Sequence, residues 1–253
     1  MNTLKKPLLF TLCLLPAALV GGWFSALYLL KSFDPSLLQQ VIDQLGSKQT
    51  LLTVSAVQAA LYALVCGFFG YLLAEKLGLL RPFRFRKAET VRVVLLSVVC
   101  GALFSLDAWT FAKWIPQLSG SYAAAGSFDA PTWLASVLYG GVIEEVMLRL
   151  FLMSLFALIG WKLFRRAESA PSDGVLIAAN VLAAFLFAAG HLPSTALLFG
   201  SLTPLIVLRC FLLNGAAGLA FGRFYRKYGI QYAMLAHILF HLVSRTIWLI
   251  ALP

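Results

Sequence analysis

Long apolar runs separated by short polar or basic stretches divide the whole sequence. A helix needs about 20 mostly apolar residues to cross the hydrocarbon core of a bilayer. The runs reach this length with few charges, and no stretch between them is long enough to form a soluble domain. The pattern predicts an all-α, polytopic transmembrane helical bundle of about seven or eight spans around an intramembrane polar cavity. The candidate spans are about 7–30, 51–74, 91–115, 132–160, 174–192, 200–222 and 230–251.

The composition supports a membrane protein rather than a soluble one. Hydrophobic residues make up 61% of the chain and charged residues 12%, whereas soluble domains carry about 25% charged residues. We therefore expect a single integral-membrane domain over residues 1–253. The net charge of +10 does not indicate nucleic-acid binding, because the basic residues lie in short clusters between the apolar runs.

These basic clusters predict the orientation of the chain. Most of the 20 lysines and arginines precede the first span or follow the second, fourth and sixth spans. Only Lys31, Lys48 and Lys113 fall in the opposite loops. Because cytoplasmic loops carry the excess of Lys and Arg, we expect a multi-pass protein with its N-terminus in the cytoplasm and its C-terminus outside. We expect residues 116–130 to form an external loop, and Asp129 and Pro131 are typical start signals for the fourth span.

The fourth span contains two adjacent glutamates, which cannot point in the same direction on a helix because neighbouring positions are about 100° apart. Glu145 and Arg149 are four residues apart and can form an ion pair. For these two residues a bracing role in the bundle is the simpler interpretation. Glu144 has no obvious local partner, and an unpaired carboxylate inside a bilayer indicates function.

All three histidines of the chain also lie in the predicted spans. His191 ends the fifth span, where a lone histidine is more often an interfacial residue than a ligand. His237, His241 and Arg245 are each four residues apart and form one polar stripe on the seventh span. Two histidines at this spacing can share a metal or hold a water and an oxyanion. Hydrogen bonding between helices is the alternative interpretation.

The depths of these side chains do not agree in a bundle of straight helices. Glu144 lies roughly 27 Å from the cytoplasmic end of its span, and His237 and His241 lie only about 10–15 Å from theirs. Tilted or kinked helices would close part of this difference. Two further polar residues, Asp107 and Arg209, are expected to pair with each other or with backbone in a structural role.

Three short motifs in this order resemble those of the CPBP intramembrane proteases, which include the CAAX prenyl endopeptidases and the bacteriocin-immunity (Abi) proteins. The resemblance lies within about 140–245, inside a motif-bearing catalytic core of 131–251, and the flanking spans match only as apolar helices. The motifs are Glu144-Glu145-x-x-x-Arg149, Phe187-x-x-x-His191 and His237-x-x-x-His241.

The resemblance implies hydrolysis of a peptide bond in a membrane-bound or lipidated protein or peptide. It implies that membrane lipid surrounds the site, and the distribution of the family indicates a bacterial inner membrane. By match to the motifs, Glu144 corresponds to the general base and His191 to its partner in activating water. His237 and His241 correspond to the groups that stabilise the oxyanion, and Glu145 and Arg149 correspond to supporting residues.

One position departs from the family pattern, which usually has Asn or Asp where this chain has His241. A neutral amide is a hydrogen-bond donor suited to an oxyanion hole, but an imidazole can also bind metal. His191, His237 and His241, together with Glu144, are a candidate zinc-ligand set. The sequence leaves open both a zinc-dependent mechanism and a metal-free mechanism with glutamate-activated water.

Two other classes of function fit the same polar residues. Polar stripes on buried helices also suit an ion or metal transporter, although no internal repeat and no paired broken helices are evident. A non-catalytic membrane immunity or scaffold protein would bind a peptide without cutting it. The sequence does not distinguish a prenylated substrate from another membrane-associated peptide.

Overall fold

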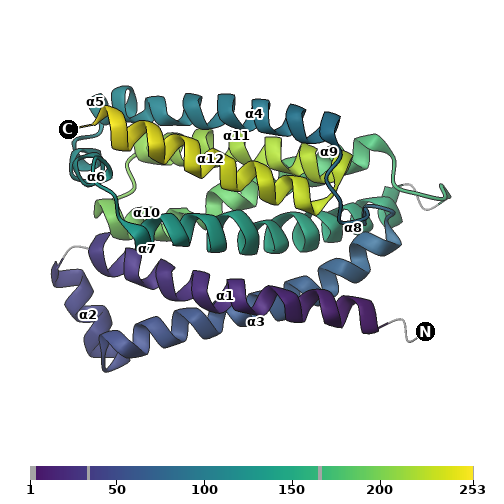
Figure 1. Cartoon of the computed structure of the whole chain (residues 1–253), viewed down its shortest axis with the longest axis horizontal. Helices are drawn as coiled ribbons and strands as arrows, with labels where there is room; N and C mark the ends of the chain where they lie inside the picture. The colour runs from purple at the N-terminus through teal and green to yellow at the C-terminus, as the bar shows by residue number, and fades with distance from the viewer. Residues whose placement is uncertain (1–3, 33–34, 165–166, 253) are drawn as a thin grey trace.

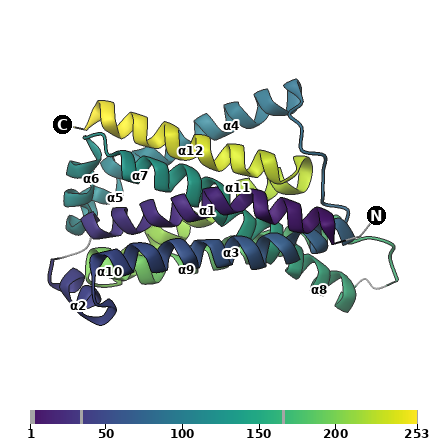
Figure 2. The ribbon, with the colours of Figure 1, turned by 60° about the horizontal axis from the view of Figure 1, so that its bottom comes forward.

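The computed structural model describes residues 4–32, 35–164 and 167–252, and this part of the chain contains helices and no strand. The long helices run side by side along one direction, and the two ends of the chain lie at opposite ends of the bundle (Figure 1). A second view shows α1 and α3 as neighbours on one side of the bundle (Figure 2). The predicted all-α class is therefore confirmed.

Within the described residues, six helices are long and apolar enough to cross a membrane. They correspond to six of the seven predicted spans, with small shifts at the ends. They are built on α1 (Lys5–Ser32), α3 (Lys48–Lys76), α4 (Lys87–Ser105), α9 (Asp173–Gly190), α11 (Pro204–Tyr228) and α12 (Ile230–Ala251).

The remaining predicted span is continuously helical but changes its winding. It consists of α7 (Ala130–Leu134), η3 (Ala135–Glu144), η4 (Val146–Met153) and α8 (Ser154–Phe164), and η3 and η4 are π-helical. Each of these four segments alone is shorter than the length that a membrane span needs. π-Helical winding is rare and often occurs at functional sites, and here it coincides with the motif that carries the two glutamates.

Short elements connect the long helices, and those labelled in Figure 1 lie at the end of the bundle opposite the N-terminus. They are α2 (Pro35–Leu45), η1 (Leu106–Trp109), α5 (Phe111–Trp114), η2 (Pro116–Leu118), α6 (Ser119–Ala125) and α10 (Leu192–Phe199). Two of them, η1 and α5, fall inside the predicted span 91–115, and the other four were not predicted because each is too short to appear as an apolar run.

Small side chains bring α1 and α3 into close contact. The buried positions of α3 include Ala56, Ala59, Ala63 and Gly67. On α1, a Cβ atom at Gly22 would lie 2.5 Å from the backbone oxygen of Ser55. Lipid is as apolar as the helices, so their association in a membrane depends on packing of this kind.

The start of α7 follows the predicted signals. The Asp129 carboxylate accepts a hydrogen bond of 3.0 Å from the backbone N–H of Thr132, and Pro131 occupies the first turn. Burial acts to raise the pKa of Asp129, but hydrogen bonds from Lys31 and Thr132 hold the pKa below its usual value. The contact with Lys31 also ties the end of α1 to the start of α7.

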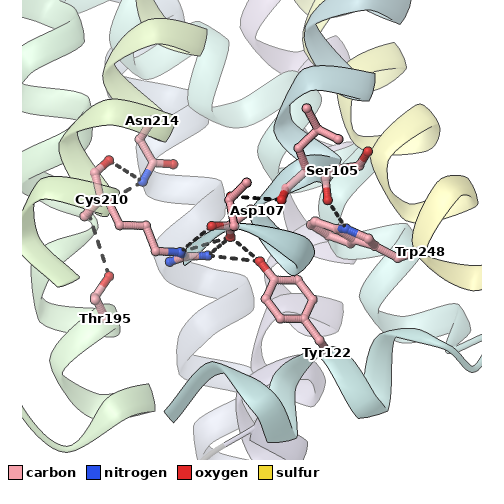
Figure 3. A network of polar contacts seen from close by, with 10 residues as sticks. Ser105, Asp107, Tyr122, Thr195, Cys210, Asn214 and Trp248 are labelled. Carbon is pink, nitrogen blue, oxygen red and sulfur yellow. Dashed lines mark hydrogen bonds and ion pairs between the residues drawn. The ribbon is translucent and has the colours of Figure 1, made fainter. Parts of the chain in front are cut away.

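At the same end of the bundle, Asp107 and Arg209 pair as the sequence suggested (Figure 3). The Arg209 Nε atom lies 3.0 Å from both carboxylate oxygens of Asp107, and the Tyr122 hydroxyl donates to the same carboxylate. Trp248 donates from Nε1 to the backbone oxygen of Ser105 at 2.9 Å. These contacts join α4 and η1 to α6, α11 and α12, and they indicate a structural role for the ion pair.

Candidate active site

Glu145 lies at the junction of η3 and η4 and is 0% exposed. Its Oε1 atom is 3.0 Å from Nη1 of Arg149, so the ion pair expected from the four-residue spacing is present. Arg149 also donates from Nη2 to the backbone oxygen of Gly218 at 3.0 Å, and its guanidinium lies over the rings of Phe187 and Phe221. The pair thus joins the η4 helix to α9 and α11.

The same carboxylate oxygen of Glu145 also contacts a histidine on another helix. Oε1 of Glu145 is 2.8 Å from Nδ1 of His237, which is 2% exposed and stacks on Phe221. An ionised carboxylate only accepts hydrogen bonds, so Nδ1 of His237 carries the proton. Sequence spacing predicted only the pair of Glu145 with Arg149. It could not predict the contact with His237, because Glu145 and His237 are 92 positions apart.

His237 in turn contacts His241 on the same helix. The two Nε2 atoms are 3.0 Å apart. Since Nδ1 of a neutral His237 is the protonated nitrogen, its Nε2 is an acceptor, and His241 is the donor of this hydrogen bond. The buried polar chain therefore runs from Arg149 through Glu145 and His237 to His241.

Two glycines of η3 allow α12 to approach this site closely. A Cβ atom at Gly140 would lie 3.1 Å from Nε2 of His241, and one at Gly141 would lie 2.3 Å from a side-chain carbon of Ile238. The absence of side chains at these positions lets the imidazole of His241 rest against the η3 backbone.

The complete polar stripe of α12 faces the η3–η4 helix. Arg245 donates from Nε to the Ser136 hydroxyl at 2.8 Å, His241 lies against Gly140, and His237 contacts Glu145. The depth difference expected from the sequence is resolved because α8 continues past the start of α12 in both views (Figures 1 and 2). Helix ends at different levels therefore bring these side chains together.

Glu144 is half-buried and has no hydrogen bond or ion pair with any residue that the structure describes. Its neighbour Glu145 is fully buried in the polar chain. As the sequence predicted, Glu145 pairs with Arg149, and Glu144 has no ion pair among the described residues. The catalytic role of Glu144 stays a prediction, because no contact with a histidine of the site is present in the described part of the chain.

His191 is the cap residue that follows α9, and its Nδ1 atom lies 2.8 Å from the backbone oxygen of Phe187. The Phe187 ring contacts both this histidine and His237 of the polar chain. Its centroid is 4.6 Å from the His191 ring and 6.2 Å from the His237 ring. His191 is therefore a neighbour of the polar chain rather than a hydrogen-bonded member of it.

The three histidines do not fit a zinc-ligand set in this arrangement. Among residues 4–32, 35–164 and 167–252, no three His, Cys, Asp or Glu side chains are placed to hold a metal ion. His237 and His241 are hydrogen-bonded to each other, and one nitrogen of His191 faces a backbone carbonyl. Zinc binding stays a prediction, and we derive no step through a metal.

Helices that can cross a membrane and a buried carboxylate–imidazole chain define a polytopic membrane protein with an intramembrane polar site. A family model described as Type II CAAX prenyl endopeptidase Rce1-like matches residues 126–243, just under half of the chain. The matched segment contains all three motifs, and it confirms the family that they resemble. The matched segment is similar to CAAX-type intramembrane proteases in general. Comparisons with curated proteins and with solved structures gave no significant match.

Proposed function

We propose that this protein is an endopeptidase that hydrolyses a peptide bond in a membrane-associated protein or peptide, with water activated by Glu144. The observation that carries the proposal is the buried chain Glu145–His237–His241 beside an unpaired Glu144. The match of residues 126–243 to a peptidase family supports the same reaction class.

In this mechanism Glu144 takes a proton from water while the oxygen attacks the amide carbon. The carboxylate is suited to this role because no described residue occupies its acceptor oxygens. The tetrahedral intermediate then loses the amine, as the carbon–nitrogen bond breaks and Glu144 returns the proton to nitrogen. His191 assists by helping to hold the water.

His237 and His241 stabilise the oxyanion. Glu145 fixes the tautomer of His237, so that His241 holds the N–H between the two rings. This N–H turns to the substrate oxygen as negative charge develops there. A donor that is already oriented in a buried site needs little reorganisation when the oxyanion forms. Its hydrogen bond stabilises the oxyanion more than the same bond would in water.

The direct test is cleavage by the purified full-length chain in lipid–detergent micelles, with a prenylated peptide and its unprenylated form as probes and mass spectrometry as the readout. Removing a general base lowers turnover by about 10²–10⁴-fold, and we expect a loss in this range for Glu144→Gln. Glu75→Gln changes an exposed carboxylate at the end of α3 and serves as the matched control. Undiminished turnover in Glu144→Gln would rule out the assigned role.

The same variant distinguishes the rival functions. A transporter would give ion flux in vesicles without peptide cleavage. A binding or immunity protein would keep its protective effect in cells after Glu144→Gln, whereas a protease would lose it. Cleavage of the prenylated probe alone would assign a lipidated substrate.

A further inference from the structure

A pocket of about 420 Å³ opens at the end of the bundle where α3 and α11 end and α9 begins. Three segments that are distant in sequence form it. They are the loop after α3, the residues around the start of α9, and the last turns of α11. The pocket shares no lining residue with the polar chain described above.

Positive charge dominates this pocket. Arg226 pairs with Asp173 at 2.5 Å, and Asp173 is the one acidic residue among the described residues that line the pocket. Arg81, Arg223 and Lys227 are exposed and have no hydrogen-bond or ion-pair partner in the part of the chain that the structure describes. Three unpaired cations therefore line one cavity.

The position of Arg81 is fixed by the turn between α11 and α12. Gly229 has φ of +106°, and a Cβ atom there would lie 2.9 Å from Cβ of Arg81. Gln231 donates from Nε2 to the backbone oxygens of Pro82 at 3.0 Å and Arg84 at 3.3 Å. The loop that carries Arg81 is therefore attached to the start of α12.

The pocket also has an apolar wall beside the cations. Leu77, Leu79 and Leu176 line it and are each at most 9% exposed. All three belong to the ends of helices that can span a membrane or to the adjoining loop. Cations beside apolar side chains at the ends of spans suit the boundary between the phosphate groups and acyl chains of a bilayer, and basic pockets between spans bind anionic headgroups.

We propose that this pocket binds a phosphate group, supplied by the headgroup of an anionic phospholipid. The unpaired side chains Arg81, Arg223 and Lys227 provide charge-assisted hydrogen bonds to its oxygens. A soluble phosphate compound offers the same chemistry, and the experiment below separates the two sources. The proposal does not depend on peptidase activity.

The test measures the Tm of the purified full-length chain in micelles that contain phosphatidylglycerol or phosphatidylcholine, with and without inorganic phosphate. Binding to the folded state raises the Tm, and we expect phosphatidylglycerol to raise it by on the order of 5 °C relative to phosphatidylcholine. The pocket variant is Arg81→Gln, Arg223→Gln and Lys227→Gln. The control variant Lys76→Gln, Arg84→Gln and Lys87→Gln removes three cations from the same end outside the pocket.

We expect the pocket variant to lose the gain in Tm and the control variant to keep it. A gain with phosphatidylglycerol alone assigns the lipid headgroup, and an equal gain with inorganic phosphate in either lipid assigns a soluble phosphate compound. Equal loss in the two triple variants, or no gain with either ligand, would overturn the proposal. If the pocket variant does not fold, Arg223→Gln alone is expected to weaken binding about tenfold, and an affinity equal to that of Arg84→Gln would overturn it.

Discussion

At the scale of single residues, two adjacent glutamates have different environments. Glu145 is 0% exposed and shares one carboxylate oxygen between Arg149 and His237. Glu144 is half-buried and has no such partner in the described part of the chain. A substitution at Glu145 should therefore lower mainly the stability, and a substitution at Glu144 should lower mainly the catalytic rate.

We expect Glu145→Gln to destabilise the protein by about 3–5 kcal/mol, because it leaves the buried guanidinium of Arg149 without its counter-charge. Glu144→Gln should change the stability by less than about 1 kcal/mol, since it breaks no ion pair. Unfolding of both variants in the same detergent measures this difference. The double variant Glu145→Gln, Arg149→Met should recover part of the loss. Equal stability of the two single variants would contradict the arrangement.

The position at which this chain departs from its family offers a second test. In His241→Asn an amide N–H replaces the imidazole N–H as donor to the oxyanion, and we expect turnover within about tenfold of the parent. His241→Leu has no donor and should lose about 10²–10³-fold. Elemental analysis of the parent and of His241→Asn accompanies the assay. Stoichiometric zinc that disappears together with activity in His241→Asn would show that a metal carries the reaction.

At the scale of elements, glycine and alanine positions decide how closely the helices approach. The glycines of η3 admit α12, and Gly22 admits the backbone of α3. At Gly22 the nearest atom belongs to the backbone of α3, so rotation of a side chain cannot relieve that contact. Close packing of this kind is the main source of helix association in a membrane.

Gly22→Ala should therefore lower the Tm by several degrees, since its Cβ would lie 2.5 Å from a backbone oxygen of α3. The matched control is Gly215→Ala in α11, where a Cβ meets no atom within 4 Å. This control should be neutral or slightly stabilising, because alanine favours helix more than glycine does. Similar Tm values for the two variants would show that α1 and α3 are less closely packed.

At the scale of the whole molecule, the six spans and the continuous helix from Ala130 to Phe164 place the two ends of the chain at opposite ends of the bundle (Figure 1). The basic loops, including the residues of the phosphate pocket, lie at the end where the N-terminus lies. The excess of basic residues at that end supports a cytoplasmic N-terminus.

Reporter fusions test this orientation in a bacterial inner membrane. Alkaline phosphatase joined to the C-terminus should be active, because it would be exported. Green fluorescent protein joined to the same position should not fluoresce, and at the N-terminus it should fluoresce. The opposite pattern would reverse the orientation and place the phosphate pocket in the outer leaflet.

Local patterns in the sequence determined the class of fold and much of the candidate site. Run length predicted the spans, the signals Asp129 and Pro131 marked the start of α7, and the four-residue spacing predicted the pair Glu145–Arg149. Each of these depends on residues close in sequence, and a membrane imposes the same length on every span. The short helices and the π-helical winding were not evident, because no apolar run or period marks them.

Only the tertiary structure placed His237 against Glu145, His241 against Gly140, and the basic loops around one pocket. These contacts depend on the rotation, level and separation of helices that are distant in sequence. Small residues and helix ends set these quantities in three dimensions, whereas helical periodicity specifies only which residues of one helix share a face. The sequence thus named the polar residues of the site, and the packing of the helices decided which of them meet.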